Sequence, residues 1–232
     1  MKTFGIISEG PTDQAVVENI VIGFFNNEDD IRINFLQPLR DATDEQATKK
    51  FGGWYKVFEY CGSQYFIDAF EQNDYLVIQI DTDRSEELNY DVKQSTQDGT
   101  KLTPAELIEA VIAKFEAVFT NTLGGEKFDL VRHRIIYAVC VNEIECWLLP
   151  LYFDDKTKQA TNNCTHKLNP KITEKFGFYI DANNKSNMVS QYGKMSKDFL
   201  KHKILTQKHS QNISLQIFIQ KLAEKGINLT AE

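Results

Sequence analysis

The sequence predicts an α/β fold with a mostly parallel central sheet flanked by helices. Short apolar, β-branched runs alternate along the chain with longer segments of helical periodicity. Carboxylate residues directly follow two of these strand-like runs, and functional residues of α/β sheets gather at the carboxyl ends of strands. The 232 residues are 42% hydrophobic and 25% charged, which is the composition of a globular protein.

The first two predicted strands flank a helix. Residues 2–8 form a short apolar run that predicts a strand, and Gly10-Pro11 interrupts it. A helix is expected from Thr12 to about Phe25, because apolar residues recur at three- and four-residue spacing. Residues 31–39 alternate apolar and polar side chains, which predicts a second strand.

The middle of the chain predicts a buried strand between helices. Residues 51–70 are rich in aromatic side chains and predict one helix, with these rings in the core rather than stacked on bases. Residues 75–80 form an apolar run typical of a strand buried on both faces. The polar residues 84–100 predict a loop, and Thr103-Pro104 is a favoured start for a helix extending to about Phe119.

The last part predicts a fourth strand and a helical extension. The strand covers residues 133–141, and a helix begins within residues 143–149. Beyond Pro150 the chain is polar and rich in Asn and Lys, and two helices are expected near residues 188–203 and 214–225. We therefore expect a core of residues 1–150, with residues 151–232 forming a Lys-rich helical extension packed on it.

Several classes of protein are disfavoured by the composition. No uncharged apolar run approaches the roughly 18 residues of a membrane helix, and the apolar run near the N-terminus is too short for a signal peptide. The sequence therefore predicts a cytoplasmic protein without membrane association. The four cysteines lack CxxC spacing, which predicts small buried thiols rather than a zinc site or a catalytic cysteine.

Charge is distributed unevenly along the chain, whose net charge is −7. Residues 156–232 contain thirteen lysines, no arginine and five acidic residues, whereas residues 1–155 contain 13 basic and 28 acidic residues. Two interpretations remain open. The lysines form a solvated face, as is common, or they let a basic segment approach a polyanion beside an acidic metal-binding region.

Three acidic residues follow predicted strands and form the candidate site. Glu9 follows the first strand, and Asp81 and Asp83 follow the third. Residues two apart in an extended segment point to the same face, so Asp81 and Asp83 are expected to converge. Carboxylates within about 4 Å repel by roughly 4 kcal/mol at an effective dielectric constant of 20, and a divalent cation reverses this energy. Mg²⁺ or Mn²⁺ suits such ligands, although the Asp pair could instead cap a turn.

These motifs resemble the signature of the Toprim family. The segments are Ser8-Glu9-Gly10-Pro11-Thr12-Asp13 and Ile80-Asp81-Thr82-Asp83, within about residues 1–145. The family includes topoisomerases, primases and OLD-family nucleases. The resemblance implies a Toprim-like fold in which Glu9, Asp81 and Asp83 hold Mg²⁺ for phosphodiester chemistry, with Glu9 also a candidate proton acceptor.

A second block, residues 142–149, resembles the E-x-E-x-W stretch of small bacterial Toprim-like proteins. It implies that Glu143 or Glu145 completes a second metal position, although either could simply start a helix. OLD-family nucleases also use a late lysine against the charge of the reacting phosphate. Lys194 is the candidate here.

The leading hypothesis is a Mg²⁺- or Mn²⁺-dependent nuclease that hydrolyses DNA or RNA. The resemblance also implies a role in phage defence with an ABC- or SMC-type ATPase partner. One alternative is a non-catalytic Toprim-like binding or regulatory subunit whose acids shape an interface. Another is a phosphatase, which is disfavoured because aspartyl phosphatases carry their DxD motif after the first strand rather than the third.

Overall fold

The computed structural model describes residues 1–26, 30–39, 53–181 and 184–226. Within these residues, parallel strands form one sheet in the order β2-β1-β3-β4, which confirms the predicted α/β class. The order places the first and third strands side by side at the centre of the sheet. The strands are β1 (Lys2–Ile7), β2 (Ile31–Gln37), β3 (Tyr75–Asp81) and β4 (Ile135–Cys140).

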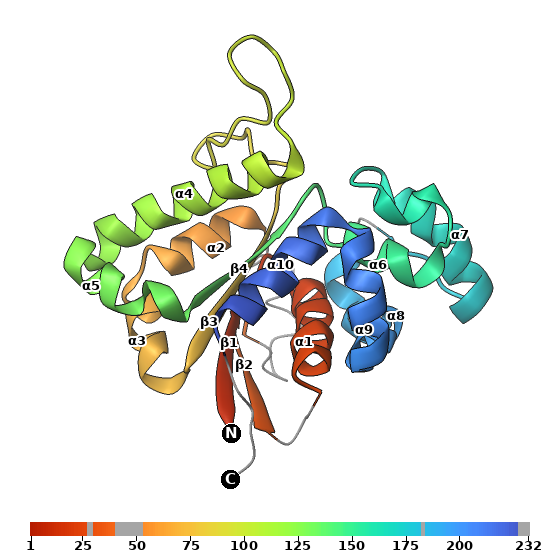
Figure 1. Cartoon of the computed structure of the whole chain (residues 1–232), viewed down its shortest axis with the longest axis horizontal. Helices are drawn as coiled ribbons and strands as arrows, with labels where there is room; N and C mark the ends of the chain where they lie inside the picture. The colour runs from red at the N-terminus through yellow and green to blue at the C-terminus, as the bar shows by residue number, and fades with distance from the viewer. Residues whose placement is uncertain (27–29, 40–52, 182–183, 227–232) are drawn as a thin grey trace.

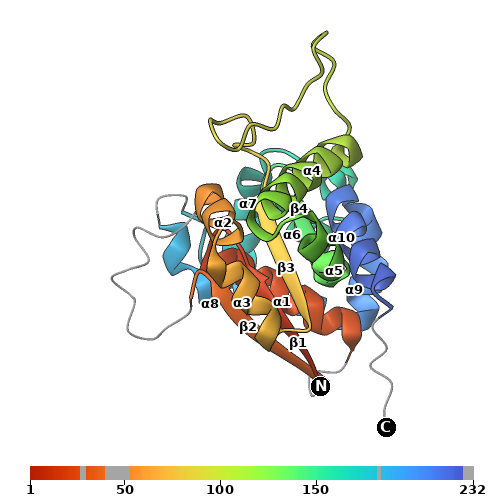
Figure 2. The ribbon, with the colours of Figure 1, turned by 90° about the vertical axis from the view of Figure 1, so that its left-hand side faces the viewer.

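Helices cover both faces of this sheet, as Figures 1 and 2 show. One face carries α2 (Trp54–Cys61), α3 (Gln64–Gln72), α4 (Pro104–Leu123) and α5 (Gly125–Val131). The other carries α1 (Pro11–Phe25), α6 (Glu145–Tyr152), α7 (Cys164–Phe176), α8 (Val189–Ser196) and α9 (His202–Lys208). The last helix, α10 (Ile213–Glu224), packs against β4 and α4.

The sheet separates two hydrophobic clusters. In β4, Ile136 and Ala138 face the cluster that includes α1 and α6, while Ile135 and Val139 face the cluster that includes α2 and α4. This period of two follows from strand geometry. Because both faces are covered, β3 is buried along nearly its whole length, as its apolar sequence predicts.

Several helix predictions differ from the structure. The helix expected near residues 188–203 consists of α8, a 3-10 turn over Lys197–Leu200 and the start of α9, and α5 was not predicted. The single helix expected over residues 51–70 is two helices, α2 and α3, separated at Gly62 and Ser63; residues 51–52 lie outside the described residues. The polar segment beyond Pro150 contains α7, which was not predicted. Its buried apolar face consists only of Cys164, Leu168 and Ile172, spaced four residues apart in a Lys-rich sequence.

The segment after α7 packs closely on α1. Asn19 Nδ2 on α1 donates hydrogen bonds to Gly193 O and to Ser196 Oγ, at 3.1 and 2.7 Å. A Cβ atom on Gly23 would lie 1.8 Å from Phe199 O, so only glycine permits this approach. The packing places the segment after α7 along α1, the helix that follows the carboxyl end of β1.

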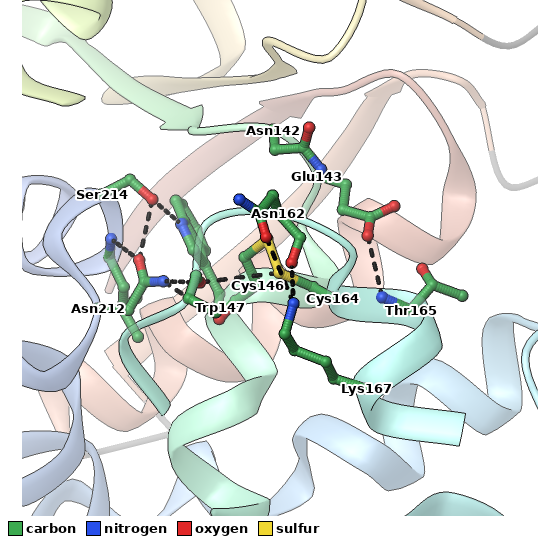
Figure 3. The surroundings of a disulfide bond; sticks show 12 residues. Asn142, Glu143, Cys146, Trp147, Asn162, Cys164, Thr165, Lys167, Asn212 and Ser214 are labelled. Atoms are coloured by element: carbon green, nitrogen blue, oxygen red, sulfur yellow. Dashed lines mark hydrogen bonds between the residues drawn. A yellow bond between two sulfur atoms is a disulfide. The ribbon is translucent and has the colours of Figure 1, made fainter. Parts of the chain in front are cut away.

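The cysteine prediction is correct for two residues and wrong for two. Cys61 and Cys140 are buried free thiols, but Cys146 and Cys164 form a disulfide bond between α6 and α7 (Figure 3). Their separation of 18 residues carries no sequence signature, because only the fold brings the two helices together. Among the described residues, no helix is both long and apolar enough to cross a membrane.

Candidate functional site

Glu9 and Asp81 meet at the carboxyl edge of the sheet because β1 and β3 are neighbours. Asp81 N donates a hydrogen bond of 2.7 Å to Glu9 Oε1, and Glu9 N donates one of 3.2 Å to Gln79 Oε1. Gln79 Nε2 then donates to Asp81 Oδ1 at 2.8 Å. These three bonds link the acids in a closed ring that fixes their relative positions.

Asp83 differs from Asp81 in its exposure to solvent. Strand β3 ends at Asp81, so the alternation expected of an extended segment does not continue, and Asp83 is exposed whereas Asp81 is buried. Thr82 N and Asp83 N both donate to Asn142 O at 3.0 Å, which fixes the turn to the end of β4. Asp83 lines an open cavity of about 530 Å³ together with Arg84, Glu86, Glu87 and Gln94.

A fourth acid, Asp13, belongs to the site and was not predicted. It lies in the first turn of α1 and is buried, and its Oδ1 has no hydrogen-bond partner among the described residues. Its charge raises the pKa of Glu9, which places the two carboxyls near each other. The sequence feature that could have identified Asp13 is its position four residues after Glu9. Because the helix begins at Gly10-Pro11, Asp13 lies in its first turn.

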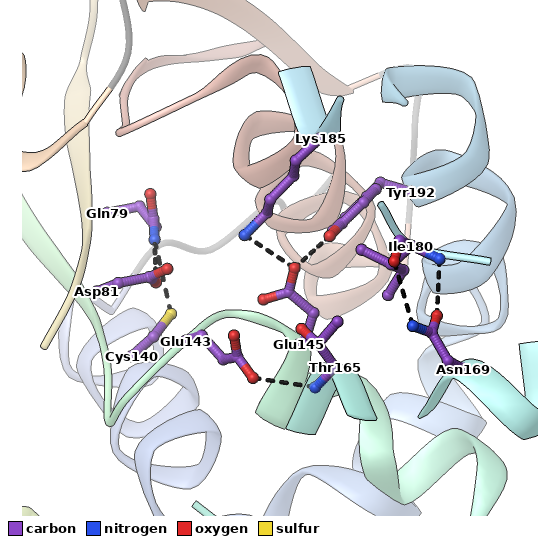
Figure 4. Close-up of polar contacts among 10 residues, drawn as sticks. All are labelled: Gln79, Asp81, Cys140, Glu143, Glu145, Thr165, Asn169, Ile180, Lys185 and Tyr192. Atoms are coloured by element: carbon purple, nitrogen blue, oxygen red, sulfur yellow. Dashed lines mark hydrogen bonds and ion pairs between the residues drawn. The ribbon is translucent and has the colours of Figure 1, made fainter. Parts of the chain in front are cut away.

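Glu145 is fully buried at the start of α6, and two residues that follow α7 in the sequence contact its carboxylate. Lys185 Nζ lies 2.8 Å from Glu145 Oε1, and the Tyr192 hydroxyl donates to the same oxygen. Figure 4 shows both groups approaching from one side while the second carboxylate oxygen points away from them. That oxygen, Oε2, has no partner within the described part of the chain.

Glu143 is bound to the start of α7, and burial together with the charge of nearby Glu145 raises its pKa. Its Oε1 accepts a 2.9 Å hydrogen bond from Thr165 N at the start of α7. Its carboxylate also lies within 4.8 Å of the sulfur atoms of Cys146 and Cys164, a grouping that could suggest a metal site. The disulfide argues against this reading in the present state, because metals bind thiolates rather than disulfide sulfurs.

The lysine that contacts the acids is Lys185 and not Lys194. Lys194 is exposed on α8, and in the described regions it forms no ion pair with Glu9, Asp81 or Glu145. Lys185 lies in a 3-10 turn, Lys185–Asn187, within a polar segment that offers no periodicity. No local pattern distinguishes Lys185 from the other lysines of this region.

Burial and mutual repulsion raise the pKa of most acids in the site. Desolvation and the charge of Asp13 raise the pKa of Glu9 to about 8, and desolvation raises that of Asp13 to about 6. The pKa of Asp81 lies well above its ordinary value because of burial and the charge of Glu9. Burial also disfavours the Glu145 carboxylate, but Lys185 and Tyr192 outweigh it and keep the pKa of Glu145 low.

These shifts predict that the metal-free protein becomes less stable as pH rises. The folded protein keeps protons on Glu9 and Asp13 that the unfolded chain releases near pH 4.5 and 3.8, so unfolding releases protons. In EDTA, we expect the free energy of unfolding to fall by roughly 5 kcal/mol between about pH 5 and pH 8, most of it from Glu9. Urea unfolding at a series of pH values measures it, with Glu9→Gln as the variant expected to flatten the slope. A free energy that rises over this window would contradict the prediction.

The donor set fits a hard divalent cation. Glu9, Asp13, Asp81 and Glu145 supply carboxylate oxygens, the ligands that Mg²⁺ and Mn²⁺ prefer. Two of these oxygens, Asp13 Oδ1 and Glu145 Oε2, are buried with no partner from the described part of the chain, which is costly unless a ligand or cation satisfies them. Exposed Asp83 extends the donor set toward the open cavity.

Comparison of this chain with protein-family models, with curated proteins and with solved structures finds no match. We therefore infer the function from the fold and from the side chains at the carboxyl edge of the sheet.

Proposed function

We propose that this protein is a divalent-metal-dependent nuclease of the Toprim type, which hydrolyses phosphodiester bonds in DNA or RNA. The observation that carries the proposal is the meeting of half-buried Glu9 with buried Asp13 and Asp81 at the carboxyl edge of a parallel sheet, all three with raised pKa values. Gathering carboxylates in this way costs stability, so a cation is the simplest reason for it.

Glu9, Asp13 and Asp81 would hold Mg²⁺ or Mn²⁺, with Asp83 at the exposed side of the site. When bound, such an ion supplies charge stabilisation to a phosphoryl oxygen and activates a water molecule for attack. The hydrogen bonds through Gln79 keep Glu9 and Asp81 in fixed positions before any ligand arrives, which limits the reorganisation needed on binding.

Lys185 takes the role that the resemblance suggested for Lys194. Its ammonium group lies beside Glu145, and its positive charge partly offsets the rise that burial causes in the pKa of Asp81 and Asp83. A fixed positive charge at this place would favour the approach of a phosphate to an otherwise acidic site. Glu145 and Tyr192 orient the ammonium group through the contacts that they make with each other and with it.

A nucleic acid is the substrate class that the charge distribution favours. Exposed lysines lie on α7 and on the segments that follow it, including Lys171, Lys175 and Lys201. These lysines would attract a phosphate backbone. The acidic first part of the chain would not attract it by itself. An ATPase partner, implied by the resemblance, stays a prediction.

The test is an incubation of the purified protein with supercoiled plasmid, single-stranded DNA and a tRNA pool, each with Mg²⁺, Mn²⁺ or EDTA. We expect cleavage that requires metal and that is lost in the Asp81→Asn/Asp83→Asn variant. Calorimetric titration with Mn²⁺ accompanies the assay. Metal binding without cleavage would favour the non-catalytic binding subunit, and the absence of both would refute a metal centre formed by these acids.

A further inference from the structure

Arg84 is the only basic residue that the described part of the chain contributes to the open cavity beside Asp83. It directly follows Asp83, in the loop between β3 and α4 (Figure 1). The side chain of Arg84 keeps 62% of its exposure. Its positive charge partly offsets the rise that burial causes in the pKa of Asp83, so the two side chains lie within electrostatic reach of each other.

Glu87 holds Arg84 through one nitrogen atom of the guanidinium group. Arg84 Nε donates a hydrogen bond of 2.6 Å to Glu87 Oε1. In the described regions, Nη1 and Nη2 of Arg84 have no hydrogen-bond or ion-pair partner. These two atoms carry most of the five N–H donors of a guanidinium group. Most of the binding capacity of Arg84 is therefore unused within the described chain.

Trp54 distinguishes this contact from an ordinary surface ion pair. Its Nε1 donates a hydrogen bond of 2.9 Å from α2 to Glu87 Oε2, so each carboxylate oxygen of Glu87 has one partner. The ring of Trp54 also packs against that of Tyr90, whose hydroxyl donates a 3.0 Å hydrogen bond to Asp81 O. The orientation of Arg84 is thus tied to the backbone of the candidate site.

The other side chains of the cavity are acidic or amide groups. Gln94 Nε2 donates a 2.8 Å hydrogen bond to Thr82 O, and Gln94 N donates one of 3.0 Å to Glu86 Oε1, which fixes the loop around the cavity. Asp83 and Glu86 would repel a free anion. A phosphate is therefore expected here as part of a strand that lysines elsewhere attract, and Arg84 is its basic partner in the cavity.

We propose that Arg84 binds a phosphate group of the nucleic-acid substrate next to the one that is cleaved, and that Glu87 and Trp54 position its guanidinium group. The inference rests on the proposed function and adds a substrate-binding residue to it. A guanidinium group presents paired N–H donors that match two phosphate oxygens. Arg84 lies on the exposed side of the site, whereas Asp81 is buried at the sheet edge, which places this phosphate beside the reacting one.

Oligonucleotide binding and cleavage kinetics of the full-length protein test this assignment. Affinity for a fluorescent single-stranded DNA of about 12 nucleotides is measured by anisotropy in EDTA over a series of salt concentrations. The measurement is made at about pH 6, because the pKa of Glu9, about 8, keeps that carboxyl neutral there. Steady-state cleavage with Mn²⁺ gives kcat and KM separately.

The variants remove the arginine or the residues that orient it. They are Arg84→Gln, Arg84→Lys, Glu87→Gln and Trp54→Phe. Arg132→Gln is the matched control, because Arg132 is also an exposed arginine and lies 3.1 Å from a glutamate oxygen, Glu116 Oε1. It precedes β4 and therefore lies at the amino edge of the sheet, opposite the candidate site.

We expect Arg84→Gln to weaken oligonucleotide binding about tenfold and to reduce the slope of log affinity against log salt by about 0.7, the amount for one phosphate contact. Arg84→Lys should keep the slope but recover only part of the affinity, since an ammonium group lacks the planar fork. Arg84→Gln should raise KM about tenfold and change kcat by less than about twofold, because a phosphate outside the reacting bond is bound equally in the ground and transition states.

The positioning residues have a distinct signature. Trp54→Phe and Glu87→Gln should each raise KM less than Arg84→Gln does, with kcat unchanged. In the Arg84→Gln background neither should raise KM further, because both act through the arginine. A residue with a merely structural role would affect KM in both backgrounds. Arg132→Gln should match the unaltered protein in every measurement.

Equal affinity and equal salt slope of Arg84→Gln and Arg132→Gln would overturn the assignment. A loss of kcat at unchanged KM would also overturn it, since Arg84 would then act on the reacting phosphate. Weaker binding of Arg84→Gln in EDTA, without cleavage or Mn²⁺ binding by the unaltered protein, would refute the proposed hydrolysis and leave the phosphate contact established. No oligonucleotide binding by the unaltered protein would refute both.

Discussion

Replacing Lys185 with methionine is expected to destabilise the protein by about 3 kcal/mol, because the change leaves the fully buried Glu145 without its counter-ion. Tyr192 alone would remain as a partner, and Glu145 Oε2 already has none within the described residues. The side chain of Lys185 keeps 29% of its exposure, so methionine can occupy its place without a steric clash.

Urea unfolding in EDTA measures this effect. Lys194→Met is the matched control, since Lys194 is exposed on α8 and its replacement should change stability by less than about 0.5 kcal/mol. Lys185→Met/Glu145→Gln should recover part of the loss, because the uncompensated charge is removed with its partner. Equal stability of Lys185→Met and Lys194→Met would show that the ion pair does not form in solution.

Asp81→Asn is expected to have opposite effects on activity and stability. Changing a residue that only supports a metal ligand typically costs 10- to 100-fold, so loss of a direct ligand should slow cleavage by at least about a hundredfold. In EDTA at about pH 8, the same variant should gain roughly 1 kcal/mol of stability, because burial and Glu9 both disfavour the Asp81 carboxylate. Asparagine keeps an oxygen that can accept the bond from Gln79 Nε2.

Steady-state cleavage assays and urea unfolding check the two effects on the same preparation. Asp68→Asn, at an exposed position on α3, is the control and should change neither quantity appreciably. A variant that loses both activity and stability would indicate that Asp81 is a structural residue. Loss of activity with a gain in stability is the combination expected of a metal ligand.

Much of the fold was determined by local sequence. The continuous apolar run of residues 75–80 indicated a strand because burial on both faces favours apolar side chains at every position. The alternation of residues 31–39 indicated a strand because successive side chains point to opposite faces. Thr103-Pro104 specified the start of α4, where Thr103 and Glu106 form a reciprocal capping box. In contrast, α7 was not predicted, because its buried face contains only one apolar residue per turn.

Within the site, the sequence by itself determined that Glu9 and Asp81 stand at strand ends, because parallel strands place their carboxyl ends at one edge. Only the tertiary structure decided which other groups join them. Packing of the C-terminal segment on α1 places Lys185, and not Lys194, beside Glu145. Packing of α7 on α6 brings Cys146 and Cys164 together. These contacts join residues 18 or more positions apart, and their geometry depends on how whole helices pack, which no local pattern of residues records.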